Sequence, residues 1–114
     1  MNIIALIPHY RHPTTLPQVV AALRAAGLPV LVVDDGSGEE YRAAVEAVCG
    51  EGVQAAFRPV NGGKGSAVKW GVKLAAEQGY SHVLQIDADA QHDFADIPRF
   101  VETARAQPQA VVCG

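Results

Sequence analysis

The sequence predicts an α/β protein in which a mainly parallel sheet lies between two layers of helices. Short apolar runs rich in Val, Ile and Leu alternate along the chain with longer amphipathic segments. The runs are continuous rather than alternating, which is typical of strands covered on both faces. Regular alternation of strands and helices favours right-handed crossovers and a three-layer α/β/α arrangement.

Five apolar runs are the predicted strands. They cover residues 3–7, 30–33, 53–57, 83–86 and 110–113. His82 stands at the start of the fourth run, and we interpret it as a structural residue of that strand.

Two of the four predicted helices begin with a possible capping box, a pattern in which side chains satisfy the first free N–H groups of a helix. Thr15 and Gln18 form this pattern ahead of the first helix. Ser37 and Glu40 repeat it ahead of the second. We therefore expect the two helices to start directly after Thr15 and Ser37.

The third helix is expected from about residue 65 to residue 78, with Gly71 or Val72 among its buried positions. The fourth should begin at Asp96 as N-cap, with Pro98 in the first turn, where its missing N–H costs nothing. No repeat or linker interrupts the pattern, so residues 1–114 are interpreted as a single domain.

Composition excludes several classes of function. A net charge of -3 without a polybasic run gives no electrostatic basis for binding nucleic acid. We find no leader and no apolar stretch of the roughly 20 residues that a membrane-spanning helix needs. The expected location is the cytoplasm, including the inner face of the membrane for a peripheral protein. Cys49 and Cys113 are interpreted as small buried apolar residues.

Acidic residues follow two of the predicted strands. Asp34 and Asp35 come after the second strand, and Asp87 and Asp89 after the fourth. Ligands of open α/β sheets bind at the carboxyl ends of the strands, where the strand order reverses. Like charges gathered at this edge repel one another, so we expect a cation or a hydrogen-bonding ligand there.

The segment from Asp87 to Asp89 has two interpretations. It is either an ordinary polar turn or a pair of hard oxygen ligands for Mg²⁺ or Mn²⁺. The carboxylates of Asp34 and Asp35 could likewise accept hydrogen bonds from a nucleobase or a ribose, while Gly36 and Ser37 suit a turn and a helix cap in any α/β protein.

A glycine-rich loop follows the third predicted strand. Residues 61–66 read Asn-Gly-Gly-Lys-Gly-Ser, which combines flexibility, one cation and a helix N-terminus that favours anions. Pro59 stands where a P-loop has its first glycine, so the spacing is not that of a P-loop. A surface loop with a solvated lysine is the alternative.

Four motifs together resemble the family-2 glycosyltransferases, which have the GT-A fold. They are Ile-Pro-x-Tyr at 7–10, Val-Asp-Asp-Gly-Ser at 33–37, Asn-x-Gly-Lys-Gly at 61–65 and Asp-x-Asp-x-Gln-His-Asp at 87–93. The resemblance covers essentially the whole chain and is greatest to bacterial members without a membrane segment; the chain is also generally similar to dolichol-phosphate mannose synthases.

The resemblance implies the N-terminal half of a Rossmann-like nucleotide-diphospho-sugar transferase fold. Members usually run to about twice this length, so we expect the acceptor-binding half to lie outside residues 1–114. The implied activity is inverting, metal-dependent transfer of a sugar to an acceptor hydroxyl, with this chain supplying the donor-binding part. On its own, the chain is expected to catalyse transfer poorly or not at all.

The resemblance also implies roles for matching residues. Arg11 stands where the family has Asn, which affects what this loop offers a nucleotide. The catalytic base is expected outside the chain, with Asp93 as the candidate within it. The implied nucleotide-sugar-binding residues are Pro8, Tyr10, Val33, Asp34, Asp35, Lys64, Asp87 and Ala88, and the implied ligands of Mg²⁺ or Mn²⁺ are Asp89, Asp87 and Gln91.

The motifs are compatible with a UDP-sugar or GDP-mannose as donor, and we favour a UDP-sugar; the acceptor is open and could be lipid-linked. Surface left exposed without the second half predicts self-association. Two alternatives remain. One is a non-catalytic nucleotide-binding or assembly domain. The other is a response-regulator receiver, although its acidic pair follows the first strand rather than the second.

Overall fold

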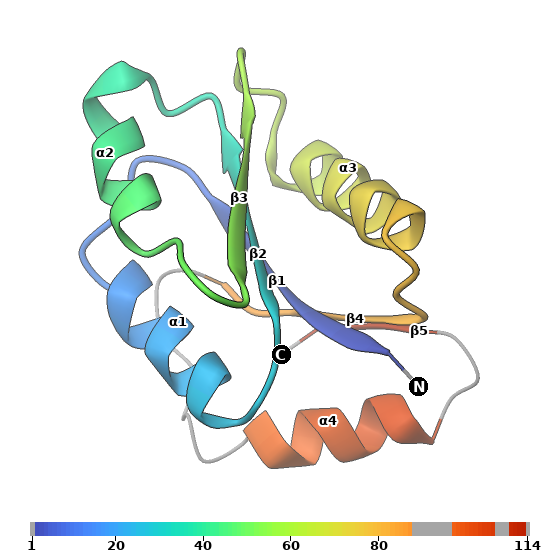
Figure 1. The fold of residues 1–114 in the computed structure, drawn as a ribbon. Helices are drawn as coiled ribbons and strands as arrows, with labels where there is room; N and C mark the ends of the chain where they lie inside the picture. Colours follow the sequence, from blue (N-terminus) through green and yellow to red (C-terminus); the bar gives the residue numbers. More distant parts are fainter. Residues whose placement is uncertain (1, 88–96, 107–109, 114) are drawn as a thin grey trace.

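The fold was analysed in a computed structural model that describes residues 2–87, 97–106 and 110–113. Strands and helices alternate throughout, as the sequence predicts (Figure 1). The strands are β1 (Ile3–His9), β2 (Val30–Asp35), β3 (Val53–Arg58), β4 (His82–Gln85) and β5 (Ala110–Cys113). The helices are α1 (Leu16–Ala25), α2 (Glu39–Ala47), α3 (Lys64–Glu77) and α4 (Ile97–Arg105).

The five strands form one parallel sheet in the order β3-β2-β1-β4-β5. The first three strands step outward in one direction, and β4 then returns to the other side of β1. The order therefore reverses between β1 and β4, which is where open α/β sheets bind ligands. Receiver domains have the order 2-1-3-4-5. The receiver alternative is thus wrong on topology.

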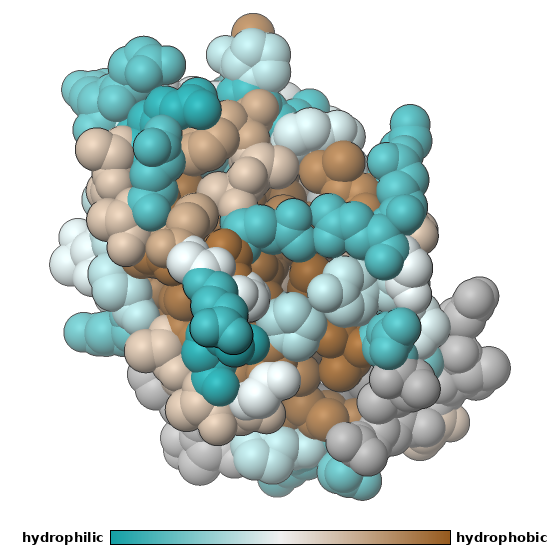
Figure 2. Space-filling model, in the orientation of Figure 1, coloured by the Kyte–Doolittle hydropathy of each residue, from teal (hydrophilic) through white to brown (hydrophobic). Residues whose placement is uncertain are grey.

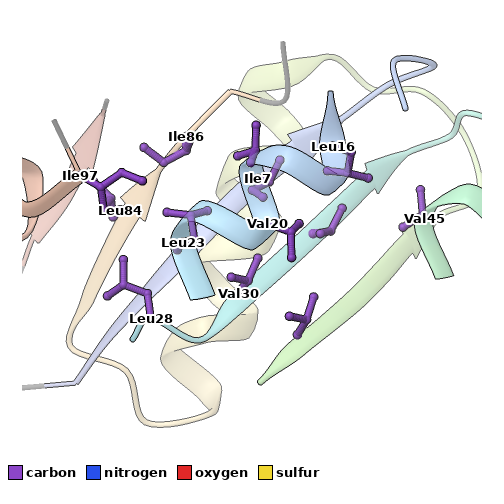
Figure 3. Close-up of a cluster of buried hydrophobic side chains, with 14 residues drawn as sticks. Ile7, Leu16, Val20, Leu23, Leu28, Val30, Val45, Leu84, Ile86 and Ile97 are labelled. Atoms are coloured by element: carbon purple, nitrogen blue, oxygen red, sulfur yellow. The ribbon is translucent and has the colours of Figure 1, made fainter. Parts of the chain in front are cut away.

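Helices cover both faces of the sheet, which confirms the three-layer prediction (Figure 1). Ala5 and Ile7 of β1 face α1, α2 and α4, and Figure 3 shows part of this cluster around Ile7 and Leu23. Ile4 and Leu6 point to the opposite face, where α3 packs. Successive strand residues thus enter different cores, which explains why the runs are continuously apolar.

Helix α3 approaches the sheet closely because Gly71 faces it. A Cβ atom at Gly71 would lie 2.6 Å from Leu6 Cδ1 and 2.9 Å from Val33 Cγ2. Glycine is the residue that allows this separation. The contact holds α3 against β1 and β2, so the N-terminal residue of the helix, Lys64, lies near the carboxyl ends of these strands.

Both predicted capping boxes are wrong, although the helices start close to the expected positions. Thr15 precedes α1 but its side chain makes no capping hydrogen bond. Gly38, with φ of 103°, is the residue before α2, and it has no side chain to cap with. Ser37 instead donates its hydroxyl to the carboxylate of Asp34 and accepts the backbone N–H of Arg11, so its oxygen binds the loop after β1 rather than the helix end. The expected N-cap of α4, Asp96, lies outside the described residues.

The described surface exposes few large hydrophobic side chains. Tyr10 and Val60 are exposed, and both lie at the carboxyl edge of the sheet. On the face drawn in Figure 2, hydrophilic side chains lie across a central area of hydrophobic residues. No helix in the described part of the chain is long and apolar enough to cross a membrane. Self-association stays a prediction.

Cys49 is half-buried rather than buried, and it lies beyond α2, before β3 begins. Desolvation raises the pKa of its thiol, and the charge of Glu46 adds to the effect. Cys49 therefore lies at the amino edge of the sheet, away from the carboxyl ends that the motifs follow.

Candidate functional site

A cavity of about 490 Å³ lies at the carboxyl edge of the sheet. Residues that follow β1, end β2, precede and begin α3, and follow β4 all contribute to it. Its position coincides with the reversal of strand order between β1 and β4. The cavity is lined by Pro8, His9, Tyr10, Arg11, His12, Asp35, Asn61, Lys64, Ala67 and Asp87.

The loop after β1 forms one wall of this cavity. Tyr10 is 44% exposed, and the Arg11 guanidinium lies 5.2 Å from the centre of its ring. Arg11 has φ of 50°, and among the described residues it is the non-glycine residue with positive φ. A left-handed conformation is unfavourable for a residue with a side chain, so other contacts must hold the loop in place.

Asp34 is buried, and protein groups bind its carboxylate. His9 Nδ1 lies 2.7 Å from Oδ1. The Ser37 hydroxyl donates to the same oxygen at 2.6 Å, and the Ser37 backbone N–H donates to Oδ2 at 3.1 Å. Such donors replace the hydrogen bonds to water that a carboxylate loses on burial. Asp34 lines a smaller hollow beside α2 rather than the main cavity.

Asp35 is buried to the same degree, but it binds the glycine-rich loop. Arg58 Nη1 donates to its Oδ1 at 2.9 Å, together with the Gly62 N–H at 3.1 Å. The Gly63 N–H donates to Oδ2 at 2.9 Å. Arg58 also donates to Ser66 Oγ at 2.9 Å. Asp35 and Arg58 together connect the end of β2 to the loop that precedes α3.

The turn after β2 touches the same loop through backbone atoms. A Cβ atom at Gly36 would lie 2.3 Å from the Asn61 nitrogen and 2.5 Å from the Val60 carbonyl carbon. Gly36 also has φ of 72°, a region that favours glycine. The glycine of the motif at 33–37 therefore serves the approach of two loops as well as the turn itself.

The opposite wall of the cavity is more open. Lys64 Nζ lies 2.6 Å from Asp87 Oδ1, and the two side chains are 56% and 30% exposed. Lys64 is the first residue of α3, and Asp87 follows β4. This ion pair is accessible to water and to any ligand that enters the cavity.

The structure brings together five of the predicted binding residues and separates two others from the cavity. Val33 is completely buried in the core on the α3 side, and Asp34 faces the hollow beside α2. Ala88, Asp89, Gln91 and Asp93 lie outside the described residues. The predicted binding residues that line the cavity are Pro8, Tyr10, Asp35, Lys64 and Asp87. The individual contacts expected with a nucleotide remain predictions.

The chain itself supplies positive and N–H groups to the acidic residues at this edge. The expectation that their gathering calls for an added cation or a hydrogen-bonding ligand is therefore corrected. The carboxylates of Asp34, Asp35 and Asp87 contact side-chain nitrogens of His9, Arg58 and Lys64, respectively. Their proximity alone is thus not evidence for a metal ion.

The described part of the cavity fits a divalent ion in one respect. Asp87 offers a hard carboxylate that lines the cavity and is partly exposed. Within the described ranges, no three His, Cys, Asp or Glu side chains come together in a group that could hold a metal. The other two predicted ligands, Asp89 and Gln91, lie in 88–96.

Sequence reasoning missed the partners of the acidic pair, His9 and Arg58. Their signal lies in the parallel register, because His9 pairs with Asp34 across β1 and β2, and Asp35 pairs with Arg58 across β2 and β3. Each predicted strand ended before these positions. Extending the strands to their polar ends would have placed the pairs side by side.

The fold and cavity define a Rossmann-like α/β protein with a cavity at its topological switch point, where open α/β sheets bind ligands. The model of the family "Glycosyl transferase family 2" matches residues 4–114. The chain therefore belongs to glycosyl transferase family 2, as the motifs predicted.

Curated relatives extend this result. The chain is 34% identical over 110 residues to an undecaprenyl-phosphate mannosyltransferase of Micrococcus luteus, covering 92% of this chain and 45% of the relative. It is 28% identical over 108 residues to a polyprenol monophosphomannose synthase of Mycolicibacterium smegmatis, covering 90% and 41%. An uncharacterised protein of Methanocaldococcus jannaschii is 30% identical over 103 residues, covering 87% and 45%. The chain thus spans less than half the length of these relatives. No solved structure matches it significantly.

Proposed function

We propose that this chain forms the donor-binding part of an inverting, metal-dependent glycosyltransferase that passes mannose from a nucleotide donor to a polyprenyl phosphate. The cavity at the switch point carries the proposal, because it combines an aromatic ring, cations and a carboxylate in one place. A nucleotide-sugar presents the matching chemistry: a flat base, two phosphates and a sugar.

The two relatives with named activities direct the choice of sugar and acceptor. Their names specify mannose and polyprenyl or undecaprenyl phosphate. This favours GDP-mannose over the UDP-sugars preferred from the motifs alone. A lipid acceptor is also compatible with the expected peripheral location at the inner face of a membrane.

The pair of Lys64 and Asp87 suits an exchange of partners when a donor binds. The ammonium group of Lys64 would turn from Asp87 to the diphosphate, and its partial exposure leaves it free to do so. Asp87, with Asp89 and Gln91, would then hold a Mg²⁺ or Mn²⁺ ion, which stabilises negative charge on a departing diphosphate. Tyr10 and Arg11 would flank the nucleotide from the opposite wall.

A phosphate acceptor changes what the protein must provide. The acceptor oxygen attacks the anomeric carbon, the bond from that carbon to the diphosphate oxygen breaks, and the nucleoside diphosphate leaves. A phosphomonoester has its second pKa near 6, so at pH 7 it is already largely ionised. With such an acceptor the attacking oxygen needs no base, and the role expected for Asp93 becomes dispensable.

Calorimetric titration of the purified chain tests the proposal. GDP-mannose and a UDP-sugar are titrated with and without Mn²⁺ into wild type, Asp89→Ala and Glu77→Ala, the last removing an exposed charge at the end of α3. We expect Mn²⁺ to strengthen binding of GDP-mannose about tenfold or more in wild type and Glu77→Ala, but not in Asp89→Ala. Equal binding by all three proteins in both conditions would refute the metal site. Failure of wild type to bind either donor would refute the donor-binding role.

A further inference from the structure

His9 lies at the point where the buried acidic pair meets the exposed cavity wall. It is the last residue of β1 and is 1% exposed, while the three residues after it line the cavity. None of the four motifs assigns it a role, since it occupies the variable position of the segment at 7–10. Its contacts nevertheless reach in two directions, toward Asp34 and toward His12.

These contacts determine which ring nitrogen of His9 carries the proton. The backbone N–H of His12 lies 3.2 Å from Nε2, and a backbone N–H can only donate. Nε2 must therefore accept, so the proton of the neutral ring is on Nδ1. From there it is donated to Asp34 Oδ1 at 2.7 Å. Both hydrogen bonds require this one tautomer.

Ser37 provides a second, parallel connection from Asp34 to the same loop. Its hydroxyl donates to Asp34 and accepts the backbone N–H of Arg11 at 2.9 Å. The Arg11 side chain returns to the Ser37 carbonyl oxygen through Nε at 3.2 Å. Two successive N–H groups of the loop, those of Arg11 and His12, are thus bound by side chains that Asp34 holds.

We infer that His9 is a positioning residue: as the Nδ1-protonated tautomer held by Asp34, it keeps the loop of residues 10–12 in the conformation that shapes the cavity, with Arg11 at positive φ. The positive φ of Arg11 is maintained because the N–H of the residue after it is bound to Nε2. The expected effect on nucleotide binding rests on the proposed function, whereas the effect on the loop rests only on the contacts of His9.

The first test uses no nucleotide. Nitrogen-15 NMR of the chain at neutral pH distinguishes a protonated from an unprotonated ring nitrogen, and the His9 signals are assigned by their loss in His9→Leu. We expect a protonated Nδ1 and an unprotonated Nε2. A proton on Nε2, alone or with Nδ1, would overturn the inference.

The second test measures the loop and then the ligand. His82→Gln is the matched control, since His82 is also a nearly buried strand residue but begins β4 at the opposite edge of the sheet. In His9→Leu we expect amide exchange at Arg11 and His12 to accelerate at least about tenfold, and GDP-mannose binding to weaken by about the same factor. His9→Asn keeps a donor toward Asp34, so its amide exchange and its GDP-mannose binding should lie between those of His9→Leu and wild type. His82→Gln should have the amide exchange and the binding of wild type.

The outcomes separate the two proposals. Amide exchange in His9→Leu equal to that in His82→Gln would overturn the role of His9, whether or not a nucleotide binds. If wild type binds no donor while the tautomer and the exchange rates are as expected, the proposed function fails and the role of His9 in shaping the loop stands. If His9→Leu does not fold, the role of His9 is tested by the tautomer in wild type and by amide exchange in His9→Asn. A proton on Nε2, or exchange in His9→Asn equal to that in His82→Gln, would then overturn it.

Discussion

Two regions at the carboxyl edge of the sheet hold their carboxylates in different ways. Asp34 and Asp35 are buried and receive hydrogen bonds from side chains and backbone N–H groups. Asp87 is partly exposed and pairs with the long, solvated side chain of Lys64. The first region thus uses its carboxylates to hold strands and loops of the protein together, and the second keeps a carboxylate accessible in the cavity.

The difference teaches that an acidic motif has separable functions. Burial makes an interaction strong but commits the group to one arrangement, because an unpaired buried charge is costly. Exposure weakens the interaction and makes exchange of partners easy. The carboxyl edge of this sheet combines both kinds of carboxylate.

The largest expected effect comes from Asp34→Ala. It leaves the Nδ1–H of His9 and both donor groups of Ser37 buried without their acceptor, so we expect the free energy of unfolding to fall by at least about 3 kcal/mol. Denaturant unfolding of the variant measures this. Asp87→Ala is the control on the more exposed side of the cavity, and it should lower the free energy of unfolding by less than about 1 kcal/mol. An equal loss of unfolding free energy in the two variants would contradict the distinction between the buried and the exposed carboxylates.

A smaller effect is expected from Arg58→Met, which keeps much of the side-chain volume and removes the cation beside Asp35. Asp35 keeps two backbone donors, so the free energy of unfolding should fall by about 2 kcal/mol. Arg42→Met removes an exposed pair with Glu46 and a contact with the Phe57 ring, and should cost about 1 kcal/mol or less. Faster amide exchange at Gly62 and Gly63 in Arg58→Met alone would show that Asp35 and Arg58 together order the glycine-rich loop; no difference between the variants would contradict this.

The smallest effect on stability is expected from Lys64→Met. Its exposed ion pair is screened by salt, so unfolding should change by less than about 1 kcal/mol, and by less still at high ionic strength. Donor binding, in contrast, should weaken about tenfold through loss of the cation at the diphosphate. Lys73→Met, on the same helix and exposed, should bind as wild type does. A Lys64→Met protein that is strongly destabilised would show that this wall is also structural.

Much of the fold could be predicted because its signals are local. Apolar runs of four or five residues mark strands covered on both faces, and each intervening helix shows one apolar side. The alternation of these elements then restricts the topology to a parallel sheet. The capping box predicted at Ser37 failed because its hydroxyl donates to Asp34 and accepts the N–H of Arg11, a partner 26 residues away along the chain.

The sequence by itself determined the order of elements, the edge at which the motifs gather and the family. Only the tertiary structure decided what each carboxylate does there, because that depends on partners 23 and 25 residues away along the chain. The register of β1, β2 and β3 places His9 beside Asp34 and Arg58 beside Asp35, and burial then makes these contacts strong. Neither register nor burial of a strand end can be seen in a motif, since both arise when the strands pair.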